Sequence, residues 1–112
     1  MSAIRDNIKG GALTETTFLV LLAVYKPLHG YGIMQFIKKV TFGRVILGAG
    51  TLYGTINTLL KKQWIAPFCD EEGNRKKEYH ITDLGMQKVE TELTRMRDIC
   101  TLARAIIEED KS

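Results

Sequence analysis

Gly48-Ala49-Gly50-Thr51-Leu52-Tyr53-Gly54-Thr55-Ile56-Asn57-Thr58-Leu59-Leu60-Lys61-Lys62 is the stretch that decides the fold. At about 100° per residue, a helix here separates an apolar side from a side of glycines and polar residues. The apolar side holds Leu52, Ile56, Leu59 and Leu60, and the polar side holds Gly50, Gly54, Asn57, Thr58 and Lys61. Small residues allow close approach to an anionic surface, and Asn and Lys can read base edges in the DNA major groove. The stretch predicts either a DNA recognition helix or an ordinary amphipathic surface helix.

Two shorter helices are expected before this one. Thr14 can cap the first, Glu15 suits its positive end, and Pro27 ends it because the residue before proline avoids helical geometry. Its expected inward residues are Phe18, Leu21, Leu22 and Tyr25. The second helix is expected at about 31–40 and is broken by Gly43, with Ile33, Phe36, Ile37 and Val40 inward and Lys38 and Lys39 outward. Three short helices with tight links are typical of a helix-turn-helix domain.

A β-hairpin is expected after the third helix. Residues 64–69 and 77–81 are typical of two strands, and the polar segment 70–76 between them predicts the turn. The basic residues of its returning arm are Arg75, Lys76 and Lys77. They can contact a phosphate backbone or a minor groove, or they can be a solvated loop tip. The acidic residues Asp70, Glu71 and Glu72 would repel DNA unless they point away.

A long last helix is expected to begin at Thr82-Asp83. Its apolar residues follow a spacing of three and four, as in a coiled coil: Met86, Val89, Leu93, Met96, Cys100, Ala103 and Ile107. About 27 residues at 1.5 Å each give a helix of roughly 40 Å, which would project beyond a small domain. A second copy is the expected partner, since closed two-fold dimers are the commonest assembly. The alternative is a helix that packs only on its own domain.

The predicted fold is therefore mostly α with a small β-hairpin. Residues 1–81 form a winged helix-turn-helix DNA-binding domain, and residues 82–112 form a C-terminal dimerisation helix. The charge is divided accordingly. Residues 1–81 hold 11 Lys and Arg against 6 Asp and Glu, whereas residues 82–112 hold 5 against 7. A basic part and an acidic tail indicate different partners.

Membrane insertion and secretion are not expected. The longest apolar run, 18–24, is far shorter than the roughly 20 residues of a membrane span. The amino-terminal residues lack a signal-peptide pattern, because charged residues there precede no long apolar segment. We therefore expect a cytoplasmic protein of one domain.

Metal, cofactor and enzyme chemistry are not expected either. The two cysteines, Cys69 and Cys100, have no further Cys or His at metal-ligand spacing and are expected to be free thiols, with a redox role for Cys100 as the alternative. Of the two histidines, His29 is expected in a turn as a structural or capping residue, and His80 is expected at an outward position of the second hairpin strand. No phosphate-loop or dinucleotide fingerprint is present.

Four motifs in order also resemble the PadR-like transcriptional regulators, over about residues 14–85. They are Leu28-His29-Gly30-Tyr31-Gly32, Gly50-Thr51-Leu52-Tyr53, Arg75-Lys76-Lys77-Glu78-Tyr79 and Ile81-Thr82-Asp83-Leu84-Gly85. The short length and single C-terminal helix are similar to the small subclass of that family. The resemblance implies a homodimeric repressor that binds a palindromic operator in double-stranded DNA and releases it when a small molecule or a stress signal arrives.

The resemblance also implies roles for individual residues. The recognition helix would be 50–62, Tyr53 would lie near the DNA backbone unless it is a core residue, and the wing would supply 75–77. Three positions depart from the family pattern: Gly54 stands where proline is common, Gln63 where glycine usually ends the helix, and Glu78 where an aromatic residue is usual. Together, residues and resemblance predict DNA contacts by Gly50, Thr51, Tyr53, Asn57, Thr58, Lys61, Arg75, Lys76 and Lys77.

The remaining expectations concern regulation and a rival function. A signal that changes the distance between two recognition helices would act at the dimer interface. A small-molecule effector would therefore bind near Met86, Met96 and the first helix, unless these methionines are plain core. The alternative function is a winged-helix adaptor that binds protein rather than DNA.

Overall fold

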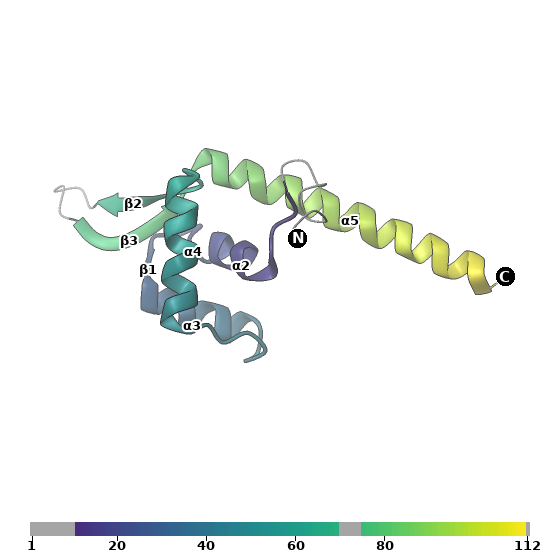
Figure 1. The fold of residues 1–112 in the computed structure, drawn as a ribbon, viewed down its shortest axis with the longest axis horizontal. Helices are drawn as coiled ribbons and strands as arrows, with labels where there is room; N and C mark the ends of the chain where they lie inside the picture. Colours follow the sequence, from purple (N-terminus) through teal and green to yellow (C-terminus); the bar gives the residue numbers. More distant parts are fainter. Residues whose placement is uncertain (1–10, 70–74, 112) are drawn as a thin grey trace, which may run out of the picture.

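A computed structural model describes residues 11–69 and 75–111. Its elements in chain order are α2 (Glu15–Ala23), β1 (Leu28–His29), α3 (Gly30–Val40), α4 (Ala49–Lys61), β2 (Ile65–Cys69), β3 (Arg75–Ile81) and α5 (Asp83–Lys111). The three short helices gather together, and the β2–β3 hairpin and the free end of α5 point to opposite ends of the molecule (Figure 1). The expectation of a mostly helical, winged helix-turn-helix fold with a long last helix is confirmed.

The first two helices are capped at their N-termini by the side chains that the sequence indicates. The hydroxyl of Thr14 accepts the backbone N–H of Thr17 at 3.1 Å and so caps α2. At the start of α3, Nδ1 of His29 accepts the N–H of Gly32 at 2.9 Å. Each cap satisfies one of the N–H groups that a helix leaves without a partner in its first turn. His29 is therefore a capping residue, as expected.

Helices α3 and α4 both end in a left-handed residue that is not glycine. At the end of α3, Phe42 has φ 54°, and the N–H of Gly43 reaches back to the carbonyl of Lys38 at 2.8 Å. At the end of α4, Gln63 has φ 62°. Glycine is the usual residue here because a side chain costs about 1 kcal/mol in this conformation. Gln63 thus makes the helix stop that the family assigns to glycine.

The sheet has three antiparallel strands in the order β1-β3-β2. Ile65 lies opposite Ile81 and Phe68 opposite Glu78, which confirms the predicted hairpin. The two-residue strand β1, in which Leu28 pairs with Tyr79, was not predicted. The register shifts after Phe68, so the wing carries a bulge on its returning strand. The predicted acidic turn lies outside the described residues.

The core lies between the three short helices, the sheet and the first turns of α5. Its buried apolar residues are Val20, Leu21, Ala23, Val24, Ile33, Ile37, Leu52, Ile56, Leu59, Ile65, Ile81 and Val89. Tyr25, Phe36 and Val40 were predicted inward but are exposed. Tyr25 follows the end of α2, Val40 is the last residue of α3, and Phe36 lies about 90° around the helix from the buried side. Those three predictions were wrong.

The first turn of α5 packs closely against the residues just before β2. A Cβ added to Gly85 would collide with the carbonyl oxygen of Trp64 and lie 2.7 Å from Cγ1 of Ile81. The hydroxyl of Thr82 donates to the carbonyl of Gln63 at 2.7 Å and accepts the N–H of Gly85 at 3.0 Å. The resemblance to the family at Ile81–Gly85 therefore has a packing reason, because only glycine allows this close approach.

The second half of α5 leaves the domain. From Arg97 to Lys111 every residue is exposed, and the molecule measures 63 × 30 × 30 Å. Val89 was assigned to a dimer interface, but it is 1% exposed and belongs to the core of its own chain. Of the predicted interface residues only Val89 is buried in its own chain, whereas Met86 and those from Leu93 onward remain at least partly exposed. No helix in the described ranges is both long and apolar enough to span a bilayer.

Candidate nucleic-acid interface

Helix α4 presents the predicted polar side to solvent. Leu52, Ile56 and Leu59 are buried against the core. The exposed residues include all those predicted to contact DNA on this helix: Gly50, Thr51, Tyr53, Asn57, Thr58 and Lys61. The predicted amphipathic division of the helix is therefore correct. That these residues contact DNA stays a prediction.

Two glycines on this exposed side have no role in internal packing. A Cβ added to Gly50 or Gly54 would meet no atom within 4 Å, in contrast to Gly30 and Gly85, where it would collide. A glycine inside a helix costs about 1 kcal/mol relative to alanine. The fold itself thus gives no reason for either residue. The flat strip along α4 leaves room for another molecule to approach the backbone closely.

Tyr53 lies on the side of α4 that faces the wing. It is 45% exposed, and a Cβ added to Gly30 would collide with its hydroxyl. One side of the phenol thus packs on the first turn of α3, while the rest faces outward. Tyr53 is therefore not a core residue. Gly30 is required so that the phenol can lie there.

A hollow of about 540 Å³ separates α4 from the wing. It is lined by Tyr53, Leu60, Pro67, Lys77, Glu78 and Tyr79. Lys77 is exposed and has φ 52°, a left-handed conformation, next to the bulge of the wing. The structure thus brings Tyr53 and Lys77 to one hollow, but it also places the carboxylate of Glu78 there. The side chains of Arg75 and Lys76 lie outside the described part.

The cationic side chains near α4 differ in whether another group of the protein contacts their charge. Arg44 forms an ion pair with Glu15, with one of its hydrogen bonds at 3.2 Å, and this pairing lowers the pKa of the Glu15 carboxyl. Lys62 lies 5.1 Å from the centre of the Trp64 ring. Lys61 has no ion pair with any residue that the structure describes. Among these cations Lys61 is the one positioned for an external anion.

A second hollow, of about 470 Å³, lies between α2 and α5. Its lining residues are Leu13, Thr14, Glu15, Phe18, Leu19, Glu92, Arg95 and Met96. Met96 therefore lies beside the first helix, where an effector was expected, whereas Met86 does not line this hollow. Glu92 is 3% exposed and was not predicted to be buried. Two hydrogen bonds from Arg95, at 3.1 and 2.5 Å, lower the pKa of this carboxyl despite burial.

The groups that enzyme or metal chemistry would need are not assembled in the described part. No cluster of three or more His, Cys, Asp or Glu residues occurs there. The ring of His80 packs edge-on against Phe68, with centroids 5.8 Å apart. Cys69 and Cys100 are free and exposed. Among described residues, the interface around α4 is therefore the strongest candidate site.

Three short helices followed by a two-stranded wing define the winged helix-turn-helix class. Residues 18–91 match the model of the transcriptional regulator PadR-like family. The chain belongs to this family, whose members are transcriptional regulators and not enzymes.

Solved structures of bacterial proteins share the fold. A PadR-like transcriptional regulator from Bacillus cereus has a TM-score of 0.61 and 20% identity, covering 81% of this chain and 88% of its own. A PadR family regulator from Eggerthella lenta has a TM-score of 0.66 and 20% identity, covering 95% and 86%. The protein smu.1704 from Streptococcus mutans has a TM-score of 0.60 and 29% identity, covering 82% and 85%.

A further relative is an uncharacterized 37.1 kDa protein in transposon TN4556 of Streptomyces fradiae. It is 38% identical over 79 residues, which cover 70% of this chain. The chain spans only 22% of that relative's length. The similarity thus concerns one part of a much longer protein.

Proposed function

We propose that this regulator is a cytoplasmic homodimeric repressor that binds a palindromic operator in double-stranded DNA. The observation that carries this proposal is the open polar side of α4. Gly50 and Gly54 leave it flat, Lys61 supplies a cation that has no ion pair among the described residues, and the wing flanks it. A helix of this shape suits the major groove, which admits one α-helix.

The residues divide by role. Lys61, Tyr53 and the basic wing residues 75–77 would contact phosphates, which gives affinity that falls with salt because counterions are released. Asn57 would supply base readout, since its amide can bond the edge of adenine. The hydroxyl of Thr58 donates to the carbonyl of Gly54 at 3.1 Å, so it would meet a base as an acceptor. Phosphate contacts set the register and base contacts select the sequence.

Dimerisation would come from the second half of α5. Ile99, Leu102 and Ile106 are 53%, 56% and 59% exposed in the single chain. A second copy of the same helix would cover them. The dimer would then hold two copies of α4 at the spacing of successive major grooves, about 34 Å.

An effector that moved α5 relative to α2 would change this spacing. The hollow lined by Phe18, Leu19 and Met96 joins these two helices, so it is the proposed place for such a ligand. A ligand that bound only one of two arrangements would shift the population of dimers able to fit the operator. Leu13, Phe18, Leu19 and Met96 in its lining, beside the half-buried Glu92–Arg95 ion pair, favour a largely apolar ligand.

The test measures binding to a selected operator and to random duplexes over a range of salt. Lys61→Ala should weaken binding to all sequences and reduce the salt slope by about 0.9 per protomer. Asn57→Ala should keep the slope but relax base preference, at a cost of about 1–3 kcal/mol on the preferred site. Glu108→Gln on α5 serves as a control and should change neither.

Two outcomes would contradict the proposal. An Asn57→Ala protein with the same base preference across a randomised operator library would remove that residue from base readout. A wild-type protein without salt-dependent affinity for any duplex would indicate an adaptor that binds protein. The carboxylate of Glu78, on the wing strand β3 and in the hollow beside α4, favours that second function.

A further inference from the structure

Phe42, directly after the C-cap of α3, has a side chain that the fold of its own chain does not use. It is 97% exposed, and Ile46, four residues further on, is 67% exposed. Phe42 also holds a left-handed conformation, with φ 54°, which glycine adopts more readily than any residue with a side chain. The helix stop explains that conformation but not the choice of phenylalanine. Exposed apolar residues that gather together mark a surface for another molecule.

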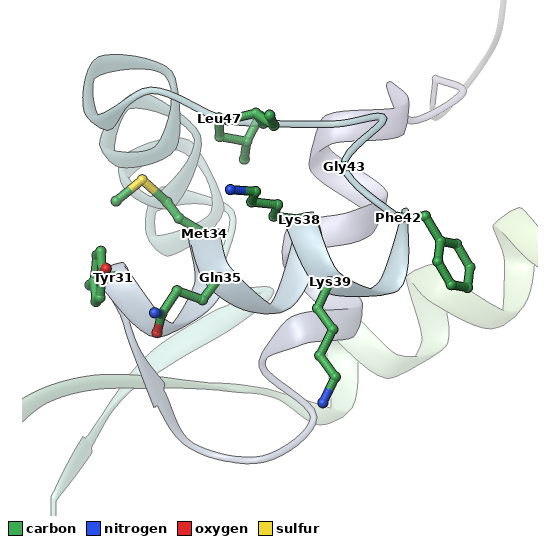
Figure 2. A pocket seen from close by; sticks show the side chains of 9 residues that line it. Tyr31, Met34, Gln35, Lys38, Lys39, Phe42, Gly43 and Leu47 are labelled. Carbon is green, nitrogen blue, oxygen red and sulfur yellow. The ribbon is translucent and has the colours of Figure 1, made fainter.

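These two apolar residues share a basic hollow. They line a space of about 720 Å³ together with Lys38 and Lys39 of α3. Among the described residues no carboxylate lines this hollow, and neither lysine has an ion pair with a residue that the structure describes. Figure 2 shows the phenyl ring of Phe42 projecting beyond the end of α3. We call Lys38, Lys39, Phe42 and Ile46 the Phe42 patch. Its occupant must offer apolar side chains together with negative charge.

The last turns of α5 carry both properties. Ile106 and Ile107 are 59% and 42% exposed, and the three acidic residues Glu108–Asp110, also exposed, follow them. At about 100° per residue, Asp110 lies on the side of the isoleucines and Glu109 lies next to it, whereas Glu108 lies on the other side. Carboxylates are unfavourable at the end of a helix, because the helix dipole places partial negative charge there. Cations supplied from outside the helix would offset this cost.

The acidic end of α5 does not reach the Phe42 patch of its own chain. The 29 residues of this helix span roughly 43 Å, and Figure 1 shows its free end pointing away from α3. A second copy brings the end there if two α5 helices pair antiparallel about a two-fold axis, because each end then lies beside the other copy's domain. Arg44, two residues after Phe42, pairs with Glu15, which lines the hollow between α2 and α5. The segment that carries Phe42 therefore adjoins the proposed dimer interface.

We propose that the acidic end of α5 in one copy docks on the Phe42 patch of a second copy. The carboxylates of Glu109 and Asp110 pair with the two lysine ammonium groups of the patch. Ile106 packs on the phenyl ring of Phe42. This contact rests on the proposed homodimer and occurs twice in it. It fixes the angle between the two copies of α4, because charge pairs across an interface select its orientation.

The experiment exchanges the charges of the two surfaces in the full chain. The patch variant is Lys38→Glu with Lys39→Glu, the tail variant is Glu109→Lys with Asp110→Lys, and the swapped variant carries all four changes. Patch and tail variants should each raise the dimer dissociation constant at least about 10-fold at low salt, because like charges then meet at both contacts. The swapped variant has the wild-type net charge and complementary surfaces, so it should return to within about 3-fold of wild type. Sedimentation equilibrium measures all four dissociation constants.

Two further variants separate docking from general effects of charge and folding. Glu108→Lys adds positive charge on the other side of the same helical turn and should change the dissociation constant less than about 2-fold. Phe42→Gly removes the ring but suits the left-handed backbone. It should raise the dissociation constant about 10-fold, since an apolar side chain loses its burial at two contacts. The thermal midpoint of the dilute monomer should not fall.

The outcomes distinguish failure of the docking from failure of the homodimer. Patch and tail variants that associate as tightly as a dimeric wild type would overturn the docking and leave the homodimer standing. Weaker association without recovery in the swapped variant would also overturn it, since the two sets of charges would then act at separate places. Unchanged association with a lower salt slope for duplex DNA in the patch variant would assign the patch to DNA instead. A wild-type protein that is a single copy at micromolar concentration would refute the homodimer and the docking together.

Discussion

The two halves of α5 share one pattern of apolar residues but have different surroundings. In the first half, Gly85, Val89 and Glu92 are buried against α2 and the sheet. In the second half, Ile99 and Ile106 remain more than half exposed. Burial of one such side chain stabilises the folded state by about 1.5–3 kcal/mol. A single chain lacks this stabilisation over the second half of α5. A seam at heptad spacing thus indicates burial, but not whether the same chain or a second copy supplies it.

The largest expected effect is on the second half. Ile99→Asp combined with Ile106→Asp would place two carboxylates in the proposed dimer interface. We expect dimer dissociation to increase at least about 100-fold, since each unpaired buried charge costs several kcal/mol. The free energy of unfolding of the monomer should not fall, because both positions are exposed there. Sedimentation equilibrium measures the first quantity and denaturant unfolding the second.

Thr101→Asp is the matched control for added charge, because Thr101 lies about opposite the seam on the same helix. It should leave the dissociation constant nearly unchanged. A double aspartate variant that stays as tightly associated as wild type would contradict the assignment of this face.

A core truncation in the first half tests the other side of the comparison. Val89 is buried in its own chain, so Val89→Ala should lower the free energy of unfolding by about 2 kcal/mol. The loss should appear equally in the double aspartate background, where no dimer forms. Leu93→Ala, at a position 44% exposed, should cost the monomer clearly less. Equal losses at both positions in the monomer would contradict the structure, in which the helix changes from buried at Val89 to exposed at Leu93.

A smaller effect concerns Glu92. Its pKa is lowered chiefly by the hydrogen bonds from Arg95, so the folded state favours the charged carboxylate. The resulting stability is present above the ordinary pKa of 4.5 and is lost as pH falls through the lowered folded value. Glu92→Gln should cost about 1 kcal/mol near neutral pH and reduce the loss below pH 4.5. Unfolding curves across this range that run parallel for wild type and variant would contradict the assigned role.

The helices and the wing were predictable because each has a long periodic pattern and a local stop or start signal. Thr14, His29 and Thr82 act at helix starts as their side chains indicate. The two-residue strand β1 was missed because two residues have no alternation to detect. It forms only because β3 returns beside it.

Side-chain burial was less predictable than the elements. Phe36 follows helical spacing, yet it is exposed because α3 packs through a narrower side centred on Ile33 and Ile37, and Val40 is exposed because it is the last residue of the helix. Glu92 is buried although carboxylates rarely are, since the nearby guanidinium of Arg95 compensates for it. An i,i+3 acid–base pair on an amphipathic helix was the available signal, but it also occurs on exposed helix faces.

The candidate DNA interface was predictable where it follows one helix. The helical periodicity of α4 identified its exposed residues. It could not show that Gly50 and Gly54 face open space or that Tyr53 packs on Gly30. The hollow between α3 and the segment before α4 depends on how that segment folds back. That arrangement is a tertiary property, and no local pattern in the sequence predicts it.

The mass of the free protein in solution tests the central claim most directly. Light scattering of the full chain at micromolar concentration should give twice the 12.7 kDa of one copy. The seam of the second half of α5 would then be covered by a second copy. A mass of 12.7 kDa at that concentration would contradict the account, because two recognition helices would no longer be held at one spacing.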